Sequence, residues 1–201
     1  DRMGPTIATT GYTVIVTLLV SIPVGMLAAW KRGRFIDKLV ATGSVLGFSV
    51  PVFITGYILI FLFAMKVRIF PVQGYVPLDQ DVFQHIRHMV LPIATLSTIY
   101  IALITRFVRT SVIDTLGEDY IRTARSKGIS ERKVITRHAL RNSLIPTITN
   151  VATDFGGLMV GATVTEGIFN INGVGGTLFR AIQSGEPATV VSLTTVLVVI
   201  Y

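Results

Sequence analysis

Residues 118–146 read EDYIRTARSKGISERKVITRHALRNSLIP, a basic, polar stretch set between long hydrophobic runs. Runs of that length are typical of membrane spans, so a polar stretch between two of them must face water. Apolar or aliphatic side chains recur around its start at three- and four-residue steps, which predicts one face of a helix. They are Ile113, Leu116, Tyr120, Ala124 and Lys127.

A turn is predicted in the middle of this stretch. Gly128 should end the first helix, because glycine takes the left-handed conformation after a helix without a Cβ clash. Ser130 is predicted to be the N-cap of a second helix, its hydroxyl accepting a backbone N–H. That second helix carries apolar residues before Pro146 opens the next run: Val134, Ile135, Ala139 and Leu140. We therefore expect a helical hairpin at residues 110–143.

The composition indicates an integral membrane protein. Of 201 residues, 51% are hydrophobic and 14% are charged, which is rare for a soluble domain. The length has room for about five spans of roughly 20 residues each. Apolar runs are expected to span at residues 6–30, 39–65, 89–108, 144–165 and 188–201. We expect a single all-α transmembrane domain over residues 1–201, and the absence of cysteine excludes disulfides and thiolate metal sites.

The positive charge is sorted between alternate connecting segments. Lys and Arg number four in residues 31–38 and nine in residues 106–141, against three in residues 66–88 and one in residues 166–187. The positive-inside rule places the first two segments in the cytoplasm and the other two outside. Because topology accounts for the net charge of +7, nucleic-acid binding is not indicated.

The polar stretch resembles the cytoplasmic coupling loop of ABC importer permeases, where an Ala is followed four residues later by Gly and a second helix leads into Leu/Ile-Pro. The string YIRTARSKGIS…RHALRNSLIP is similar to the branch that imports oligopeptides, dipeptides or nickel. In the general signature Glu-Ala-Ala precedes the Gly, and alignment on Gly128 puts Arg122, Thr123 and Ala124 at those positions. Only Ala124 matches, a departure that fits the peptide branch. The similarity extends from Gly4 to the final residue.

This resemblance implies the type I ABC importer permease fold and a place in the cell inner membrane. The chain would form half of a pore with a similar but non-identical permease subunit. Two ATP-binding cassette subunits would hold the ATP and Mg, and an extracytoplasmic binding protein would deliver substrate; this chain itself would bind no cofactor. Oligopeptides or dipeptides are the first substrate choice, and nickel, glutathione or another small solute the second. The family normally has a further N-terminal span, which we expect to be missing here, and the last helix is expected to be cut short.

The resemblance also implies that the first hairpin helix docks in a cleft of a cassette subunit. Tyr120, Ala124 and Ile129 would fill that cleft, and the nearby basic side chains would orient the contact. The full expected docking set is Asp119, Tyr120, Arg122, Thr123, Ala124, Arg125, Lys127, Gly128, Ile129 and Ser130. Two alternatives are a basic amphipathic helix lying on the anionic inner leaflet and a solvated connector that serves topology alone.

Asp154 lies near the centre of the fourth apolar run, where a charge is costly unless it faces a cavity or a partner. One interpretation places it with Asn150 in the translocation path, as a contact for a cationic or amine-bearing substrate. The other makes it a buried carboxyl that is protonated or bonded to Asn150 or Thr153. The resembling family commonly has Gln here, so the acid is a departure.

Four residues after this run resemble the family's extracytoplasmic turn, in which an acid, a Phe and Pro-Gly-x-Gly recur. They are Glu166, Phe169, Gly173 and Gly175, with Asn172 in the place of Pro. We expect them to contribute to an outer gate or to the dock of the binding protein.

The remaining motifs are weaker. His85 and His88 have helical spacing, but no third metal ligand lies near them, so a plain loop role is expected and no metal site is predicted. GxxxG spacings at residues 43–47 and 157–161 permit close helix approach. No Walker motif, nucleophile–base pair or paired carboxylates indicate a catalytic residue. The rival class is an ion-gradient-driven secondary transporter, which typically shows internal repeats and several midplane ionisable groups.

Overall fold

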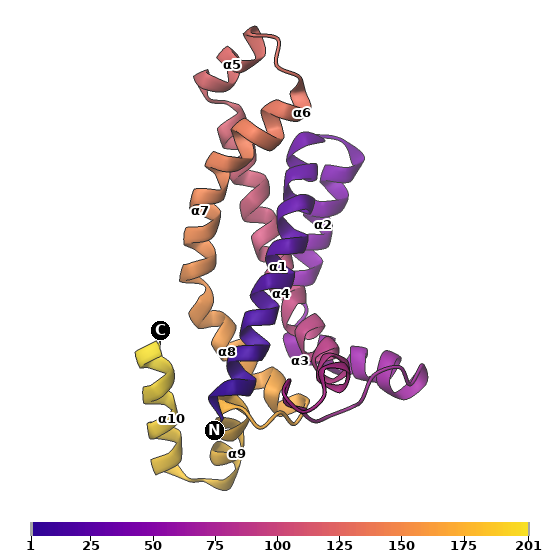
Figure 1. Cartoon of the computed structure of the whole chain (residues 1–201), viewed down its shortest axis with the longest axis vertical. Coiled ribbons are helices and arrows are strands. Elements are labelled where there is room, and N and C mark those ends of the chain that lie inside the picture. The colour runs from indigo at the N-terminus through magenta and orange to yellow at the C-terminus, as the bar shows by residue number, and fades with distance from the viewer. Residues whose placement is uncertain (1, 201) are drawn as a thin grey trace. The chain divides into compact units, whose positions relative to one another are not determined.

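The computed structural model describes residues 2–200, and every regular element in that range is a helix. The elements, in chain order, are α1 (Met3–Trp30), α2 (Phe35–Ser49), α3 (Val52–Leu59), η1 (Ile60–Lys66), α4 (Val82–Leu116), α5 (Asp119–Ser126), α6 (Glu131–Lys133), η2 (Val134–Ala139), α7 (Leu140–Thr153), α8 (Phe155–Ile168), α9 (Val174–Ser184) and α10 (Pro187–Ile200) (Figure 1). The two η elements are π-helical. The all-α prediction is confirmed.

Two helices, α1 with 28 residues and α4 with 35, are long and apolar enough to cross a membrane. A third span results if α2 and the α3–η1 helix, which are interrupted between Ser49 and Val52, are counted together. Pro51 explains this interruption, because proline has no backbone N–H and disfavours helical conformation in the residue before it. Within residues 2–200 the five apolar runs expected to span are helical except at residues 50–51 and 154, and residue 201 of the last run lies outside the described residues.

Three predicted boundaries are wrong. The run at residues 144–165 is divided between α7 and α8, which are separated at Asp154. The expected loop at residues 66–88 ends early, because α4 begins at Val82, and the expected loop at residues 166–187 contains α9. Apolar residues recur along α9, and Gly185 follows its end with φ of 69°, so both signals of a helix were present in the sequence.

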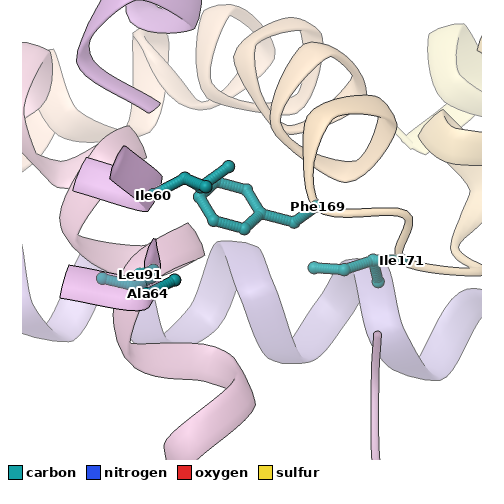
Figure 2. Packing of buried hydrophobic residues seen from close by; sticks show 5 residues of the cluster. All are labelled: Ile60, Ala64, Leu91, Phe169 and Ile171. Carbon is teal, nitrogen blue, oxygen red and sulfur yellow. The ribbon is translucent and has the colours of Figure 1, made fainter. Parts of the chain in front are cut away.

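The chain divides into two compact units, of which the first comprises residues 2–16, 50–99 and 155–200. Its core joins η1 and α4 to the turn after α8 (Figure 2). The buried residues are Ile60, Ala64, Leu91, Phe169 and Ile171. The amide of Gly74 donates a hydrogen bond of 2.9 Å to the carbonyl of Phe169, which ties the segment before α4 to this core.

The second unit comprises residues 17–49 and 100–154. In it α1 and α4 pack closely around Gly25, since a Cβ there would lie 2.8 Å from the carbonyl oxygen of Thr105. A cluster of Ala29, Ile104, Val108 and Val112 continues this contact. By contrast, a Cβ on Gly43 would meet nothing within 4 Å, so Gly43 makes no close helix contact within the described chain.

Candidate functional site

The predicted hairpin is present and has a hydrophobic core of its own. The chain leaves α4 at Leu116, forms α5, turns at residues 127–130 and returns through α6 and η2 into α7. Ile121 and Val134 are fully buried between the two arms, and Ala124 and Ala139 complete the cluster. α7 continues directly from η2. Short connections therefore join the two arms of the hairpin to α4 and α7.

Gly128 ends α5 as predicted, in the left-handed conformation with φ of 74°. Its amide bonds the carbonyl of Arg125 at 2.9 Å, and the amide of Ile129 bonds the carbonyl of Ala124 at 3.3 Å. These two bonds form a Schellman motif, and Ile129 packs on the hairpin core as that motif favours. The turn is therefore a defined structure whose geometry depends on glycine.

Ser130 is the N-cap residue of α6, as predicted, but its side chain makes no capping hydrogen bond. Instead the neighbouring Glu131 bridges the arms, because its carboxylate accepts two bonds from Arg125, of 2.7 and 3.1 Å. The hydrogen-bonded guanidinium lowers the pKa of Glu131. The phenol of Tyr120 accepts a second bridge of 2.7 Å from the amide of Asn142.

The expected docking residues divide into an outer and an inner set. Exposed on the hairpin are Asp119, Tyr120, Arg122, Thr123, Arg125, Lys127, Gly128 and Ser130. Ala124 is only 6% exposed and packs inside the hairpin, and its contact with a partner's cleft stays a prediction. Ile129 is half-buried against the same core. The predicted stripe missed Ile121, which lies one residue from Tyr120 and is the deepest side chain of α5.

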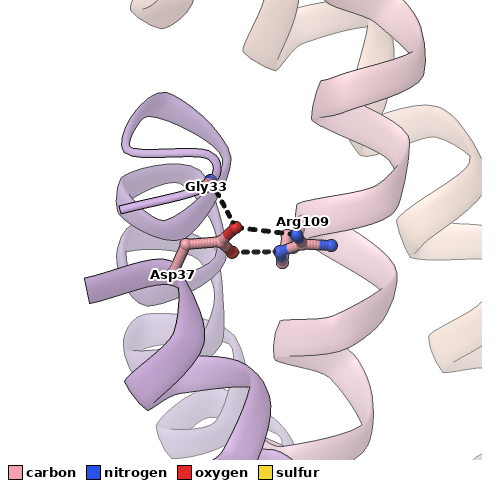
Figure 3. A network of polar contacts seen from close by, with 3 residues as sticks. All are labelled: Gly33, Asp37 and Arg109. Atoms are coloured by element: carbon pink, nitrogen blue, oxygen red, sulfur yellow. Dashed lines mark hydrogen bonds and ion pairs between the residues drawn. The ribbon is translucent and has the colours of Figure 1, made fainter. Parts of the chain in front are cut away.

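The hairpin stands away from the turn that joins α1 to α2. Both carboxylate oxygens of Asp37 accept hydrogen bonds from Arg109, and one also accepts the amide of Gly33 at 2.8 Å (Figure 3). The Asp37–Arg109 pair holds the α1–α2 turn beside Arg109 of α4. From Arg109, α4 continues to Leu116, a distance of about 10 Å at 1.5 Å per residue. Figure 1 shows α5 and α6 beyond that turn.

Neither Asp37 nor Arg109 was singled out from the sequence. The available signal was a lone acid within the basic connector at residues 31–38. Its partner lies 72 residues away, so sequence spacing gave no means of pairing them.

Asp154 lies at the break between α7 and α8 and not within a continuous helix. Its amide bonds the carbonyl of Asn150 at 2.8 Å, while the hydroxyl of Thr153 bonds the carbonyl of Thr149. One carboxylate oxygen of Asp154 is buried and has no hydrogen-bond partner among residues 2–200. A bond from this oxygen to Asn150 or Thr153, one of the alternatives that the sequence left open, is not made among the described residues.

The four residues expected at an outer gate form a buried turn that fixes the start of α9. Glu166 accepts the amide of Gly176 at 2.8 Å, and the hydroxyl of Thr6 accepts the amide of Val174 at 2.9 Å. Phe169 is in the core of this unit. A Cβ on Gly173 would collide with Glu166 and Thr6, and one on Gly175 would collide with Thr163. Close packing thus explains both glycines, and a gating role stays a prediction.

His85 and His88 lie in α4, so the predicted loop role is wrong. His85 is buried, with Nδ1 2.7 Å from the carbonyl of Val76 and Nε2 3.3 Å from the hydroxyl of Tyr12. Nδ1 of His88 lies 2.8 Å from the carbonyl of Gln84 in the preceding turn of the same helix. Over the described part of the chain, no group of three or more His, Cys, Asp or Glu side chains is placed to hold a metal ion.

The long apolar helices of the described chain indicate a multi-pass membrane protein. Residues 21–201 match the family described as the binding-protein-dependent transport system inner membrane component. The chain belongs to this family.

The curated relatives that match this chain are named as permeases of transport systems. A probable peptide ABC transporter permease of Sinorhizobium fredii is 42% identical over 186 residues, covering 92% of this chain and 59% of the relative. A dipeptide transport system permease of Escherichia coli is 38% identical over 193 residues, covering 85% and 57%. A glutathione transport system permease of Escherichia coli is 37% identical over 183 residues, covering 91% and 57%. The chain thus spans just under three fifths of the length of these relatives.

Proposed function

We propose that this chain is a pore-forming permease subunit of an ATP-driven importer of oligopeptides or dipeptides. Family membership and relatives named for peptide and dipeptide transport support this proposal. The relative named for glutathione transport supports the same chemistry, because glutathione is itself a tripeptide. Nickel or another small solute of the same branch is the second choice.

The proposed site of energy input is the hairpin, and its internal core is the observation that carries the proposal. A helix that lies on a lipid leaflet needs an exposed apolar face. In α5 that face is already used, since Ile121 and Ala124 pack against Val134 and Ala139. A connector that served topology alone would need neither this core nor the Schellman turn at Gly128. A rigid, polar, outward-standing hairpin is suited to docking on a protein.

The proposed partners follow from that docking surface. Two ATP-binding cassette subunits would hold ATP and Mg in the cytoplasm, where the positive-inside rule puts both basic segments. A second, non-identical permease would complete the pore in the cell inner membrane, and an extracytoplasmic binding protein would supply substrate. The chain itself would bind no cofactor.

The proposed mechanism is mechanical. ATP binding draws the two cassette subunits together and moves the docked hairpins. Because α4 leads into the hairpin and α7 leads out of it, a displacement of the hairpin acts directly on both helices. ATP shifts the balance between inward- and outward-facing states only by its different affinity for them.

Transport by the reconstituted complex tests the proposal. The full-length protein, its partner permease and the cassette subunits are placed in liposomes with the binding protein outside and ATP in the lumen. We expect uptake of a labelled dipeptide that requires luminal ATP and is insensitive to collapse of ion gradients. Uptake by the permeases alone, driven by a proton or sodium gradient, would instead establish the secondary-transporter class.

A further inference from the structure

A basic cavity of about 690 Å³ lies beside the Gly128 turn, on the arm of the hairpin opposite α5. It is lined by Gly128, Ile129, Ser130, Lys133, Arg137 and His138. Lys133 and Arg137 are four residues apart, so their side chains leave the same face of the helix, and both are exposed. No carboxylate lines the cavity in the described structure.

Within residues 2–200, no acid forms an ion pair with the positive charge of this cavity. The acids of the hairpin that form ion pairs are used elsewhere: Asp119 lies 3.5 Å from Arg122, and Glu131 lies 2.7 Å from Arg125. Neither Lys133 nor Arg137 takes part in an ion pair within residues 2–200. The hydroxyl of Ser130, free of its expected capping bond, adds a neutral donor at the rim.

We propose that this cavity receives acidic side chains, Asp or Glu, from the surface of the docked ATP-hydrolysing subunit. The inference rests on the proposed function, because it extends the same docking surface across the Gly128 turn. That turn is open on the side of the missing Cβ, where nothing lies within 4 Å. A guanidinium can hold one carboxylate through two parallel bonds, and a nearby ammonium adds a point charge.

A protein carboxylate fits this position better than a lipid phosphate does. The hairpin begins about 10 Å beyond the Asp37–Arg109 pair, because α4 runs on from Arg109 to Leu116. The cavity lies on that projecting segment, next to exposed α5, and not beside the apolar helices. Charge pairs at such a rim set the orientation and rate of docking more than its final strength.

Charge reversal at both positions tests the proposal. The Lys133→Glu/Arg137→Glu variant of the full-length protein is compared with wild type for binding of its co-expressed cassette subunits as salt is raised. We expect binding about tenfold weaker at low salt, with the difference shrinking as salt screens the charges. Arg132→Glu is the matched control, because Arg132 is exposed on the same helix but does not line the cavity. It should change binding by no more than about twofold.

A carbodiimide cross-link tests the chemistry of the occupant directly. The reagent joins a lysine amine to a carboxylate in contact with it. We expect a peptide that joins Lys133 to an Asp or Glu of the cassette subunit, lost in Lys133→Arg, which keeps the charge but not the amine. Hydrogen exchange of the hairpin amides should be unchanged in every variant, since both side chains are exposed.

Each outcome bears on one proposal. If wild type fails to bind cassette subunits, the proposed function fails. If wild type binds them but the double reversal binds equally well, or Lys133 forms no cross-link to them, the inference about the cavity is overturned and the proposed function stands. It is also overturned if the reversal weakens binding to vesicles of anionic phospholipid and leaves subunit binding unchanged.

Discussion

Gly128 offers the sharpest test of docking, because two properties of this residue can be tested separately. One is its positive φ, and the other is the open space where a Cβ would lie. With φ of 74°, an L-residue other than glycine or asparagine costs about 1–2 kcal/mol. No steric cost within the chain is added, since a Cβ would meet nothing within 4 Å. Gly128→Val should therefore open the turn about 5- to 30-fold more often, while Gly128→Asn should cost markedly less.

The two variants separate strain from contact at the docking surface. Hydrogen exchange at the amides of Gly128 and Ile129 measures opening of the turn, because both amides donate its closing bonds. We expect Gly128→Asn to keep near-native protection and yet to lose most of its binding to the cassette subunits, because its side chain projects into the space proposed for the partner. Gly128→Val should lose both, while membrane insertion remains intact.

The reasoning would be refuted by one clear result. If Gly128→Asn retains both the protected turn and full binding of the cassette subunits, the open side of Gly128 does not contact them. The glycine would then serve only the backbone of the turn. Ser126→Asn is the matched control, because it adds an amide to an exposed residue of the same helix without a demand for positive φ.

Three further predictions concern the helices below the hairpin. Asp37→Asn should cost about 1–3 kcal/mol in thermal unfolding, because it removes the carboxylate oxygen that accepts one of the two bonds from Arg109. Gly25→Val should destabilise the packing of α1 on α4 by about 1–3 kcal/mol in thermal unfolding, whereas Gly43→Ala, with open space, should have little effect. Asp154→Asn should reduce uptake of cationic peptides and spare neutral ones; equal uptake of both would return Asp154 to a structural role.

The sequence predicted those parts of the fold that depend on residues close together in the chain. Hydropathy located the apolar helices, Gly128 located the hairpin turn, and the spacing of small and apolar residues indicated two helical arms. Boundaries failed where tertiary contacts decide them. The α7–α8 break at Asp154 has no proline or glycine at its centre. The signals for α9 itself were local, but its first residue is fixed by Thr6, which accepts the amide of Val174 from 168 positions away.

The site was less accessible to sequence reasoning than the fold, because a shift of one residue turns a position on a helix by about 100°, enough to take a side chain out of the buried face. Over residues 119–127 the predicted stripe used Tyr120, Ala124 and Lys127, of which only Ala124 is buried. The true inner face uses Ile121 and Ala124, three residues apart. With only eight residues in α5, the apolar pattern is too brief to fix the phase without the opposing arm.

That inner face also explains why a single residue of the general Glu-Ala-Ala signature is matched here. Arg122 and Thr123 are exposed, so their identity concerns whatever the hairpin contacts. Ala124 packs on the opposing arm, and its carbonyl accepts the bond that closes the Schellman turn. A larger side chain at Ala124 would separate the arms and move Gly128, whereas changes at the two exposed positions leave the hairpin intact. The fold thus requires one small residue four positions before the glycine, and the two positions before it are free to suit the partner.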